Sequence, residues 1–305
     1  MMSEFAEINQ RFVERYEKID DSKEFWEYMA KPLRFSFRVN TLKASIDDVI
    51  ESLSDRFEIE KIPWCKEGFF CDREVGDTIE HQIGVIFSQE ASSMIPAIAL
   101  NPKPNMIVLD MCASPGGKTT QIAQYMQNEG CIIANDVKYD RINILISNIQ
   151  RCGVTIARVT MKDGRFFKRF RETFDRVLID APCSNVGMIR KNYRYLKMWS
   201  LKEVYSLSRL QKELVLAGYK SLKHGGIMVY STCTLDPLEN EEVIDFLLSN
   251  TDAKLERIDL PVNRTEPIIE FEGKSYDDEV KKCLRIHPQD NNTEGFFIAK
   301  ILKPK

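Results

Sequence analysis

The stretch Val177-Leu-Ile-Asp-Ala-Pro-Cys-Ser-Asn-Val-Gly187 joins a short apolar run to an acid, a proline and a thiol. An apolar run bounded by turn residues predicts a buried strand of a parallel sheet, which here ends at Asp180. Ligands of open α/β sheets bind just beyond the carboxyl ends of the strands. Asp180 and Cys183 are therefore candidate ligand-facing groups, although a hydrogen-bonded carboxylate beside a buried, inert thiol would give the same pattern.

Strand and helix patterns alternate on either side of this stretch, from residue 106 onward. Regular alternation of this kind predicts a doubly wound α/β domain with a mostly parallel sheet, over residues 86–305. A helix at 89–100, kinked at Pro96, is expected to lead into it. The predicted strands are 106–110, 131–135, 156–160, 175–180, 226–231, 282–287 and 295–302. The predicted helices are 117–127, 138–151, 200–222 and 238–249.

Residues 1–85 have a different pattern, which predicts a small α+β domain. Phe35, Phe37 and Val39 alternate with polar residues, as in a strand with one polar face. Ser45 is a candidate N-cap for the helix that follows. The predicted helices are 4–18, 22–30 and 46–53, and further strands are expected at 57–60, 69–72 and 77–80.

Basic side chains of this small domain stand among aromatic ones, at Lys31, Arg34, Arg38 and Lys43. Basic and aromatic groups on one sheet face suit single-stranded RNA, because the cations hold phosphates and the rings stack on bases. An ordinary solvated sheet face would show the same residues. The pattern makes residues 1–85 a candidate RNA-binding domain.

The composition of the 305 residues is ordinary for a soluble protein, with 43% hydrophobic and 29% charged residues. No apolar run is long enough to span a bilayer, and the N-terminus lacks the pattern of a secretion signal. The eight cysteines include no C-x-x-C pair, so we expect reduced thiols in the cytoplasm and no metal site. A net charge of −3 gives no global attraction to nucleic acid, so such a partner must be held by local basic patches.

A loop of small residues follows the first predicted strand of the α/β domain, in Ile107-Val-Leu-Asp-Met-Cys-Ala-Ser-Pro-Gly-Gly-Lys-Thr119. Small residues let the backbone approach a nucleotide-like ligand. A phosphate-binding P-loop would need glycine where Cys112 stands, and the G-x-G-x-x-G spacing of dinucleotide folds is missing. The candidate cofactor-binding residues of this loop are Cys112, Ala113, Ser114, Pro115, Gly116, Gly117 and Lys118.

Acids at successive strand ends would face the same ligand as this loop, namely Asp110 or its loop, Asp136 and Asp163. Asp136 is placed to accept hydrogen bonds from ribose hydroxyls, and Asp163 could bind an adenine amino group. Arg141, five positions after Asp136, is either a further cofactor contact or an ordinary surface residue. Without a phosphate cradle, an adenosine cofactor that lacks a phosphate tail fits best. We therefore expect S-adenosylmethionine as the cofactor. NAD is the alternative if only the ribose-binding acid, Asp136, is considered.

A second predicted strand ends in the same way as the opening stretch. Gly226-Ile-Met-Val-Tyr-Ser-Thr-Cys-Thr234 runs into Cys233, as the opening stretch runs into Cys183. Two thiols at matching strand ends are less easily explained by chance than one. We expect both to reach one crevice. A disulfide between them is a competing interpretation, which a cytoplasmic chain disfavours.

Three of these motifs together resemble the Nop/Sun family of RNA cytosine-5 methyltransferases. They are Cys112-Ala-Ser-Pro-Gly-Gly-Lys118, Asp180-Ala-Pro-Cys183 and Ser231-Thr-Cys-Thr234. The resemblance extends from about residue 30 to the end, because Pro32–Lys43, His287-Pro-Gln-Asp290 and Glu294-Gly-Phe-Phe297 look like further motifs of the family. Asn185 and Glu294 stand where the family usually has glycine. Both departures could alter loop shape and RNA contacts, but neither removes a reacting group.

The resemblance implies a Rossmann-like class I methyltransferase domain and a covalent mechanism. C5 of cytosine is a poor nucleophile, so a thiolate first adds to C6, and C5 then takes the methyl group. By resemblance Cys233 is this nucleophile, and Cys183 assists its release once the C5 proton is removed. Asp180 would bind the base at N3 and N4 and border the cofactor, and Lys118 would support the same pocket. A helix-start lysine held by a carboxylate is the alternative for Lys118.

Two basic clusters of the α/β domain are candidate RNA contacts, since the target cytosine must be flipped out of structured RNA to be reached. One consists of Lys162, Arg165, Lys168, Arg169 and Arg171. The other consists of Arg190, Lys191, Arg194 and Lys197, mixed with Tyr193, Tyr195 and Trp199. A solvated run of charges is the alternative interpretation.

The sequence therefore predicts an S-adenosylmethionine-dependent RNA cytosine-5 methyltransferase, acting as a monomer in the cytoplasm. tRNA is the expected substrate, given the breadth of the family and the lack of a long extra domain. An rRNA enzyme is the first alternative. A catalytically silent RNA-binding or assembly protein is the second, although the two cysteines and Lys118 speak against it. An NAD oxidoreductase, without its glycine fingerprint, is a distant third.

Overall fold

The computed structural model describes residues 2–305, and the contacts between them divide the chain into two units. Unit 1 contains the chain up to Leu33, together with Ala181–Val215 and Tyr230–Ile301. Unit 2 contains Arg34–Asp180, Leu216–Val229 and Leu302–Lys305. The division between Asp180 and Ala181 falls inside the strand-end stretch, so its acid belongs to unit 2 and its thiol to unit 1.

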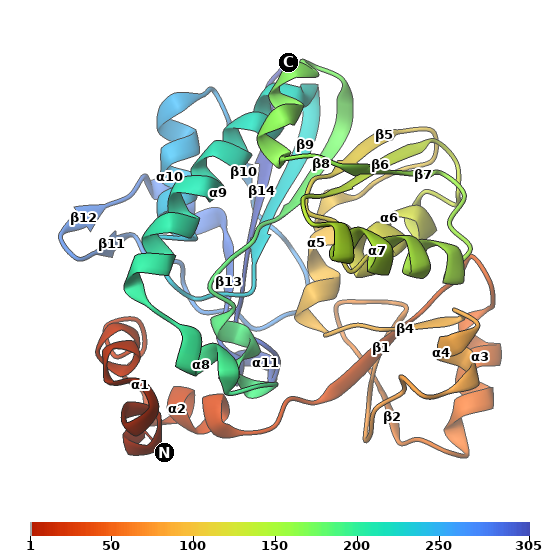
Figure 1. The fold of residues 1–305 in the computed structure, drawn as a ribbon, viewed down its shortest axis with the longest axis horizontal. Helices are drawn as coiled ribbons and strands as arrows, with labels where there is room; N and C mark the ends of the chain where they lie inside the picture. The colour runs from red at the N-terminus through yellow and green to blue at the C-terminus, as the bar shows by residue number, and fades with distance from the viewer. Residues whose placement is uncertain (1) are drawn as a thin grey trace. The chain divides into compact units, whose positions relative to one another are not determined.

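Unit 2 begins with an antiparallel four-stranded sheet in the order β2-β3-β1-β4 (Figure 1). Its strands are β1 (Phe35–Val39), β2 (Ile59–Lys61), β3 (Gly68–Cys71) and β4 (Ile86–Ser88). Phe37 of β1 lies opposite Phe69 of β3, and both belong to a core cluster that includes residues of α3 (Ile46–Ser54). The Ser45 side chain accepts a hydrogen bond from the Asp48 N–H and so caps α3, as predicted.

The predicted polar, RNA-facing side of β1 is wrong, because almost the whole strand is buried. Arg38 is fully buried and donates hydrogen bonds to Gln89 Oε1 (3.0 Å), Thr120 Oγ1 (2.9 Å) and Gln124 Oε1. Two of these acceptors belong to α6 (Gly117–Tyr125), so Arg38 joins the antiparallel sheet to that helix. Arg38 is a structural group and not the RNA contact that its place among aromatics suggested.

The strand predicted at 77–80 is also wrong. Residues Ile79–Gln82 form a short helix, α4, and the fourth strand of the sheet is β4. The Thr78 side chain accepts a hydrogen bond from the His81 N–H (3.2 Å), which favours a helix start. This local cap overrides the preference of threonine and isoleucine for strands.

The second part of unit 2 contains the predicted α/β sheet, which the structure confirms. Strands β7-β6-β5-β8 are parallel neighbours in that order, and β9 (Leu222–Thr232) follows β8. These strands are β5 (Ile107–Asp110), β6 (Cys131–Asp136), β7 (Ala157–Met161) and β8 (Phe174–Asp180). Helices α6 and α7 (Tyr139–Arg151) pack against β6 (Figure 1). Because parallel strands end at one edge of a sheet, Asp110, Asp136 and Asp180 share that edge.

The helix predicted at 89–100 is shorter than expected. A 3-10 turn, η1 (Ser92–Met94), leads into α5 (Ile95–Leu100), and Pro96 stands in the first turn of this helix. Proline fits there, since the N–H that it lacks would have no partner within the helix. Pro96 therefore begins the helix and does not kink it. A further 3-10 turn, η2 (Gly164–Arg169), follows β7.

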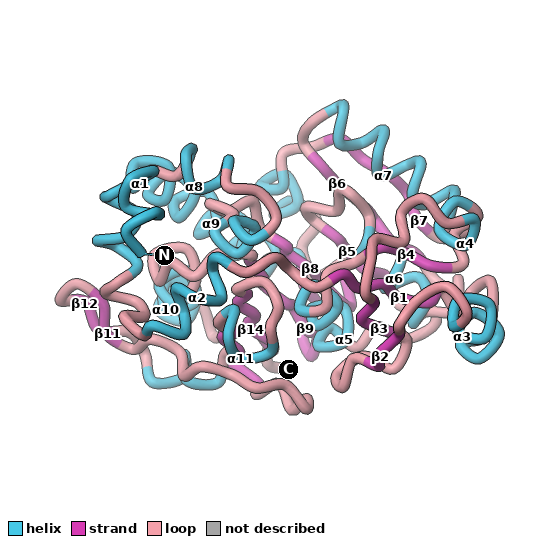
Figure 2. Tube along the Cα trace, turned by 90° about the horizontal axis from the view of Figure 1, so that it is seen from below, coloured by secondary structure: helices cyan, strands magenta, loops and turns pink. Residues whose placement is uncertain are grey.

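Unit 1 is built around an aromatic core. Helices α1 (Met2–Tyr16), α2 (Lys23–Ala30) and α8 (Arg194–Met198) supply most of it, and α1 and α8 lie side by side (Figure 2). The helix predicted at 4–18 is interrupted at Asn9, whose backbone is not helical. Asn9 Nδ2 instead donates to the carbonyl oxygens of Leu196 and Trp199, both at 3.0 Å, which ties α1 to α8.

The remaining helical segments of unit 1 are η3 (Val186–Arg190), most of α9 (Leu201–Ser221), α10 (Glu241–Asn250), η4 (Asp278–Lys282) and α11 (Pro288–Asn291). Its strands are the end of β9, β10 (Lys254–Glu256), β11 (Glu270–Phe271), β12 (Lys274–Ser275), β13 (Leu284–Ile286) and β14 (Phe296–Leu302). β13 and β14 pair antiparallel, which confirms the last two predicted strands. Every helix among residues 2–305 is too short or too polar to cross a bilayer.

Candidate active site

The loop between β5 and α6 in unit 2 makes a tight turn beside the end of β6. Gly116 has a φ of +109°, and a Cβ there would lie 3.1 Å from Leu145 Cδ1, so this position requires glycine. The Ser114–Pro115 peptide is cis, and the Ser114 N–H donates to Asp136 Oδ2 at 3.3 Å. The loop predicted to approach a cofactor is thus held against the predicted ribose-binding acid.

The Asp136 carboxylate is fixed from several sides. Arg141 Nε lies 3.1 Å from Oδ1 and 3.0 Å from Oδ2, and the Val137 N–H donates to Oδ1 at 2.8 Å. Arg141 Nη2 also donates to the Ser114 carbonyl oxygen at 2.7 Å. Arg141 therefore acts on the acid and on the loop at once, and its charge-assisted hydrogen bonds set the orientation of both.

Asp163 lies beyond the end of β7 and caps η2. Its Oδ1 accepts a hydrogen bond from the Arg165 N–H at 2.9 Å, and its carboxylate pairs with the Arg165 guanidinium at 2.6 Å. These contacts hold the pKa of Asp163 below its usual value. The Asp163 side chain is 45% exposed. The predicted adenine contact therefore requires this carboxylate to be shared between Arg165 and the ligand.

Lys118 and Asp180 form an ion pair within unit 2. Lys118 Nζ lies 2.8 Å from Asp180 Oδ2 and 2.9 Å from Ser93 Oγ. The lysine side chain is 11% exposed and the acid is 31% exposed, so the pair meets solvent mainly through the carboxylate. This arrangement agrees with both interpretations of Lys118, support of a reactive pocket and a helix-start lysine held by an acid.

Asp110, at the end of β5, is a fully buried acid. Its Oδ2 accepts a hydrogen bond from Thr119 Oγ1 at 2.6 Å, and its Oδ1 has no hydrogen-bond partner among the described residues. Burial raises the pKa of Asp110 to about 7, and the neighbouring Asp180 raises it as well, whereas Thr119 and Lys118 act in the opposite direction. A buried oxygen without a partner needs an explanation, and a ligand bound at this strand end would supply one.

The two cysteines of the strand-end motifs lie together in unit 1. The Sγ atoms of Cys183 and Cys233 are 3.3 Å apart, and the two cysteines are not joined by a disulfide. Cys233 Sγ also lies 3.3 Å from Asn185 Oδ1, and Cys183 Sγ lies 3.9 Å from the same oxygen. The structure therefore brings together the two thiols expected to act on one base, without the disulfide that was the alternative.

Asn185 has a conformation that explains its departure from the glycine of the family motif. Its φ of +57° lies in the left-handed region, which glycine adopts freely and asparagine more readily than most other residues. Its Nδ2 donates to the Cys183 carbonyl oxygen at 2.9 Å. The second departure, Glu294, is buried, and its carboxylate pairs with Lys191 Nζ at 2.5 Å.

A buried carboxyl, Glu239, contacts the loop that carries Cys183. Glu239 Oε1 lies 2.5 Å from Ser184 Oγ, and Oε2 accepts hydrogen bonds from the Ser184 N–H (3.0 Å) and from Gln211 Nε2 (2.9 Å). Burial raises the pKa of Glu239 to about 8, and Asp236 raises it too. No local sequence pattern points to Glu239, since Ser184 and Gln211 are 55 and 28 positions away.

Arg190 is buried, and the prediction that it binds RNA is wrong. Its guanidinium donates hydrogen bonds to the carbonyl oxygens of Lys31 (3.1 Å), Pro32 (3.1 Å) and Thr293 (2.6 Å), and to Asn292 Oδ1 (2.7 Å). Carbonyl groups from distant segments hold this arginine inside unit 1, which no run of basic residues in the sequence can reveal.

Two aromatic members of the same predicted cluster are also part of the fold. Trp199 belongs to the aromatic core of unit 1, and Tyr195 packs against that core. In the two basic clusters of the α/β domain, the residues that remain exposed are Lys162, Arg165, Lys168, Arg169 and Arg171 in unit 2, and Lys191, Tyr193, Arg194 and Lys197 in unit 1.

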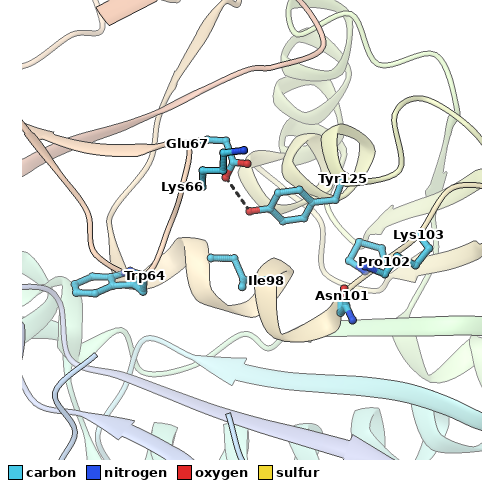
Figure 3. A pocket seen from close by; sticks show the side chains of 8 residues that line it. All are labelled: Trp64, Lys66, Glu67, Ile98, Asn101, Pro102, Lys103 and Tyr125. Carbon is cyan, nitrogen blue, oxygen red and sulfur yellow. Dashed lines mark hydrogen bonds between the residues drawn. The ribbon is translucent and has the colours of Figure 1, made fainter. Parts of the chain in front are cut away.

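Unit 2 also contains an open pocket of about 360 Å³, shown in Figure 3. Its lining residues are Trp64, Lys66, Glu67, Ile98, Asn101, Pro102, Lys103 and Tyr125. The Tyr125 hydroxyl donates to Glu67 Oε2 at 3.3 Å. None of the eight is a predicted site residue. Across residues 2–305, no group of three or more His, Cys, Asp or Glu side chains is arranged to hold a metal ion.

Two family models match the chain. The model described as 16S rRNA methyltransferase RsmB/F matches residues 97–302, a range that contains all the strand-end acids and both thiols. The chain belongs to the RsmB/F family of methyltransferases. The model for the N-terminal domain of 16S rRNA methyltransferase RsmF matches residues 8–91. The RsmB/F proteins are Nop/Sun methyltransferases, so the family resemblance of the sequence motifs is confirmed.

Individual members of this family are similar over different shares of their length. The tRNA (cytosine(49)-C(5))-methyltransferase of Pyrococcus abyssi is 61% identical, over 99% of this chain and 98% of its own length. Ribosomal RNA small subunit methyltransferase F of Photobacterium profundum is 42% identical, over 89% of this chain but 58% of its own length. A solved methyltransferase homolog from Pyrococcus horikoshii is 38% identical and superposes with a TM-score of 0.88, covering 99% of this chain and 98% of that one.

Proposed function

We propose that this RsmB/F protein transfers a methyl group to C5 of a cytosine in structured RNA, and that its substrate is tRNA. The observation that carries the proposal is the pair of strand-end thiols, Cys183 and Cys233, with sulfur atoms 3.3 Å apart. Two neighbouring thiols suit a reaction in which one adds to the base and the other assists release. The 61% identity with the Pyrococcus abyssi tRNA enzyme, over nearly the whole of both chains, supports tRNA as the substrate.

S-adenosylmethionine is the cofactor that we propose for unit 2, and the residues present there fit it. The turn at Gly116 allows a close backbone approach, Asp136 is oriented at a strand end, and Asp110 Oδ1 lacks a partner among the described residues. Asp163 is assigned to the adenine amino group. When bound, the cofactor supplies an electrophilic methyl group on a sulfonium. The missing glycine spacing makes NAD the poorer fit.

In this proposal the two cysteines have different roles in the covalent reaction. The thiolate of Cys233 attacks C6 of the cytosine, and electron density moves to C5, which then accepts the methyl group. Cys183 assists removal of the C5 proton, directly or through a water molecule. The electron pair of the C5–H bond restores the C5–C6 double bond, and the C6–S bond breaks. Cys233 is thereby returned as a thiolate for the next cycle.

Asp180 and Lys118 prepare the base for this attack. Asp180 hydrogen-bonds the cytosine at N3 and N4, which stabilises the charge that develops on the ring. Lys118 keeps the Asp180 carboxylate in place through its 2.8 Å contact, and Ser93 holds Lys118 in turn. We assign Lys118 to this support of the pocket, since its own side chain is largely buried.

RNA binding is assigned to the exposed basic side chains of the two clusters and to the predicted domain at residues 1–85. Phosphates bind to such groups without regard to sequence, so recognition of the target depends on the base that is flipped out. We further propose that the protein acts as a monomer in the cytoplasm. Light scattering of the purified protein at micromolar concentration tests the monomer, and a mass of about twice 35.4 kDa would contradict it.

Methyl transfer from labelled S-adenosylmethionine to defined RNAs tests the function. We expect label in tRNA transcripts, and we expect replacement of a single cytosine by uracil to abolish it. If label entered only 16S rRNA, the substrate would be rRNA and not tRNA. RNA binding without transfer to either RNA would instead indicate a catalytically silent RNA-binding protein. Bisulfite sequencing of RNA from cells with and without this gene would identify the modified position.

A further inference from the structure

The two reacting thiols stand on separate loops, 50 positions apart in the chain, yet the reaction requires them to act on one base. Cys183 lies in the loop after β8 and Cys233 in the loop after β9. A reacting group misplaced by about 1 Å can lower a rate by about 100-fold. Both loops of unit 1 are hydrogen-bonded to the neighbouring residues Glu239 and Asn240.

Glu239 holds the chain directly after Cys183 and, through Gln211, directly before it. Its carboxyl contacts the N–H and the hydroxyl of Ser184. Gln211 Nε2 donates both to Glu239 Oε2 and to the Pro182 carbonyl oxygen, each at 2.9 Å. All three polar side chains are buried, so water does not compete for these hydrogen bonds.

Asn240, the next residue, holds the chain on both sides of Cys233. Its Oδ1 accepts a hydrogen bond from Thr232 Oγ1 at 2.6 Å, and its Nδ2 donates to the Thr234 carbonyl oxygen at 2.9 Å. The two loops are also joined to each other, because Ser184 Oγ lies 2.8 Å from Thr234 Oγ1. Asn240 is fully buried as well.

We propose that the dipeptide Glu239-Asn240 positions the two thiols relative to each other, with Glu239 acting on the Cys183 loop and Asn240 on the Cys233 loop. This inference rests on the proposed function, in which both thiols react. The hydrogen bonds of both residues go to the chain beside the cysteines, so both act as positioning residues. Their loss should affect the two chemical steps differently, because Cys233 forms the covalent adduct and Cys183 assists its release.

The hydrogen bonds of Glu239 suggest a conservative variant. Ser184 Oγ donates to Oε1 of the ionised carboxylate, and Oε2 accepts two N–H groups. In the neutral acid Oε1 is therefore the oxygen that carries the proton, and the direction of its hydrogen bond with Ser184 Oγ is reversed. A glutamine can reproduce this pattern, with its oxygen in the place of Oε2 and its amide nitrogen in the place of Oε1. Asp236, which pairs with Arg15, raises the pKa of Glu239, and Glu239 in turn raises the pKa of the buried Tyr16.

The experiment measures turnover and covalent protein–RNA adduct on denaturing gels, in the full-length protein with a tRNA transcript. Glu239→Ala should lower kcat by about 10- to 100-fold and raise the adduct fraction, because release is impaired. Asn240→Ala should lower kcat by a similar factor of about 10 to 100 without raising the adduct fraction, because formation is impaired. Glu239→Gln should stay within about 5-fold of the wild type and should not accumulate adduct.

Leu247→Ala is the matched control for lost stability, since Leu247 is a buried apolar side chain of α10, the helix that begins directly after Asn240. It should lower the melting temperature while leaving kcat within about 2-fold and the adduct fraction unchanged, when assayed well below that temperature. If Glu239→Ala does not fold, Ser184→Ala replaces it, because it removes the hydroxyl between Glu239 and Thr234 and should also raise the adduct fraction.

The outcomes separate this inference from the proposed function. If the wild-type protein forms neither product nor adduct with any RNA, the proposed function is wrong, and so is the inference that rests on it. An active wild type whose Glu239→Ala and Asn240→Ala variants lose product and adduct in parallel, as a partly unfolded protein would, overturns the inference alone. Variants with unchanged kcat overturn it too.

Discussion

At the scale of single residues, the proposed chemistry of this RsmB/F protein assigns different tasks to two thiols. Cys183 and Cys233 have sulfur atoms in contact and share the Asn185 side chain as a neighbour. Burial raises the pKa values of two further cysteines, Cys65 and Cys283, so their reactive thiolate forms are suppressed. Exchanging the two strand-end thiols one at a time separates their tasks.

Cys233→Ala should abolish methyl transfer while cofactor binding stays unchanged, because the attacking sulfur is lost and unit 2 is not altered. Cys183→Ala should instead leave a covalent protein–RNA adduct, because the C5 proton is not removed. Calorimetric titration with S-adenosylmethionine and denaturing gels give the two measurements. Cys131→Ala, a thiol of β6, is the control. Turnover by Cys233→Ala would show that another group attacks C6.

The buried acid Asp110 predicts a dependence of stability on pH. The unfolded chain loses this proton near pH 3.8, and burial raises the pKa of the folded state to about 7. Between these values the folded state binds more protons, so the free energy of unfolding falls as pH rises. The contribution of Asp110 to the free energy of unfolding is therefore fully present below about pH 4. It falls by up to about 1.4 kcal/mol per pH unit as the pH rises, and it is lost by about pH 7.

Asp110→Asn should make this fall shallower, because the amide does not ionise. Urea unfolding at several pH values between 4.5 and 7.5 measures the slope. Asp175→Asn is the control, since Lys223 and the Ile107 N–H hold the pKa of Asp175 below its usual value. The contribution of Asp175 is lost only as pH falls below about 4. Equal slopes for the wild type and Asp110→Asn would contradict the raised pKa.

At the scale of elements, single contacts decide how strands, helices and turns join. The loop after β8 turns at Asn185 in a left-handed conformation. The antiparallel sheet meets α6 through one buried arginine, Arg38. Both features were visible in the sequence as residue types, but their structural roles depend on a backbone angle in one case and on distant acceptors in the other.

Asn185→Gly should preserve the fold of the Cys183 loop, because glycine adopts a φ of +57° without strain. Asn185→Val should lower the free energy of unfolding by about 1–2 kcal/mol more, because a β-branched residue is strained in the left-handed region. Chemical denaturation of both variants measures the difference. Equal stabilities would mean that the loop changes its backbone to accommodate valine.

Arg38→Met should lower the free energy of unfolding by about 3 kcal/mol or more, because it leaves buried acceptors on Gln89, Thr120 and Gln124 without their donor. Arg34→Met is the matched control on the same chain segment. Arg34 is partly exposed and pairs with the exposed Glu60, so its loss should cost no more than about 1 kcal/mol. Similar losses for the two variants would contradict a structural role of Arg38.

At the scale of the whole molecule, a net charge of −3 coexists with exposed basic clusters. RNA must then be held by local positive patches. Because Arg38 and Arg190 are buried, the candidate RNA contacts are the exposed residues of the two basic clusters. Affinity for phosphates falls with salt in proportion to the number of phosphate contacts. The salt dependence of binding therefore shows which cluster contacts the RNA.

Charge reversal at Lys168, Arg169 and Arg171, and separately at Arg194 and Lys197, should weaken tRNA binding at low salt. Each lost phosphate contact should also lower the slope of log affinity against log salt by about 1. Filter binding or fluorescence titration over a range of salt concentrations measures both quantities. Charge reversal at Lys281 and Lys282, which lie in surface ion pairs of η4, is the control and should have little effect.

Features that depend on near neighbours in the chain could be predicted from the sequence. Alternating strands and helices predicted the doubly wound sheet, because the period of apolar residues is set within each element. The strand-end motifs predicted two thiols and a set of acids, because parallel strands end at one edge. Family membership followed from the same motifs and was confirmed by the match over residues 97–302.

Which polar residues are buried, and what they contact, could not be predicted before the chain was seen folded. Arg38 and Arg190 look like exposed cations in the sequence, yet each is surrounded by acceptors from distant segments. Glu239 shows no local signal, yet it lies beside the Cys183 loop through contacts that span up to 55 positions. Burial and pairing depend on groups that meet only when the chain folds, whereas periodicity is contained within each element.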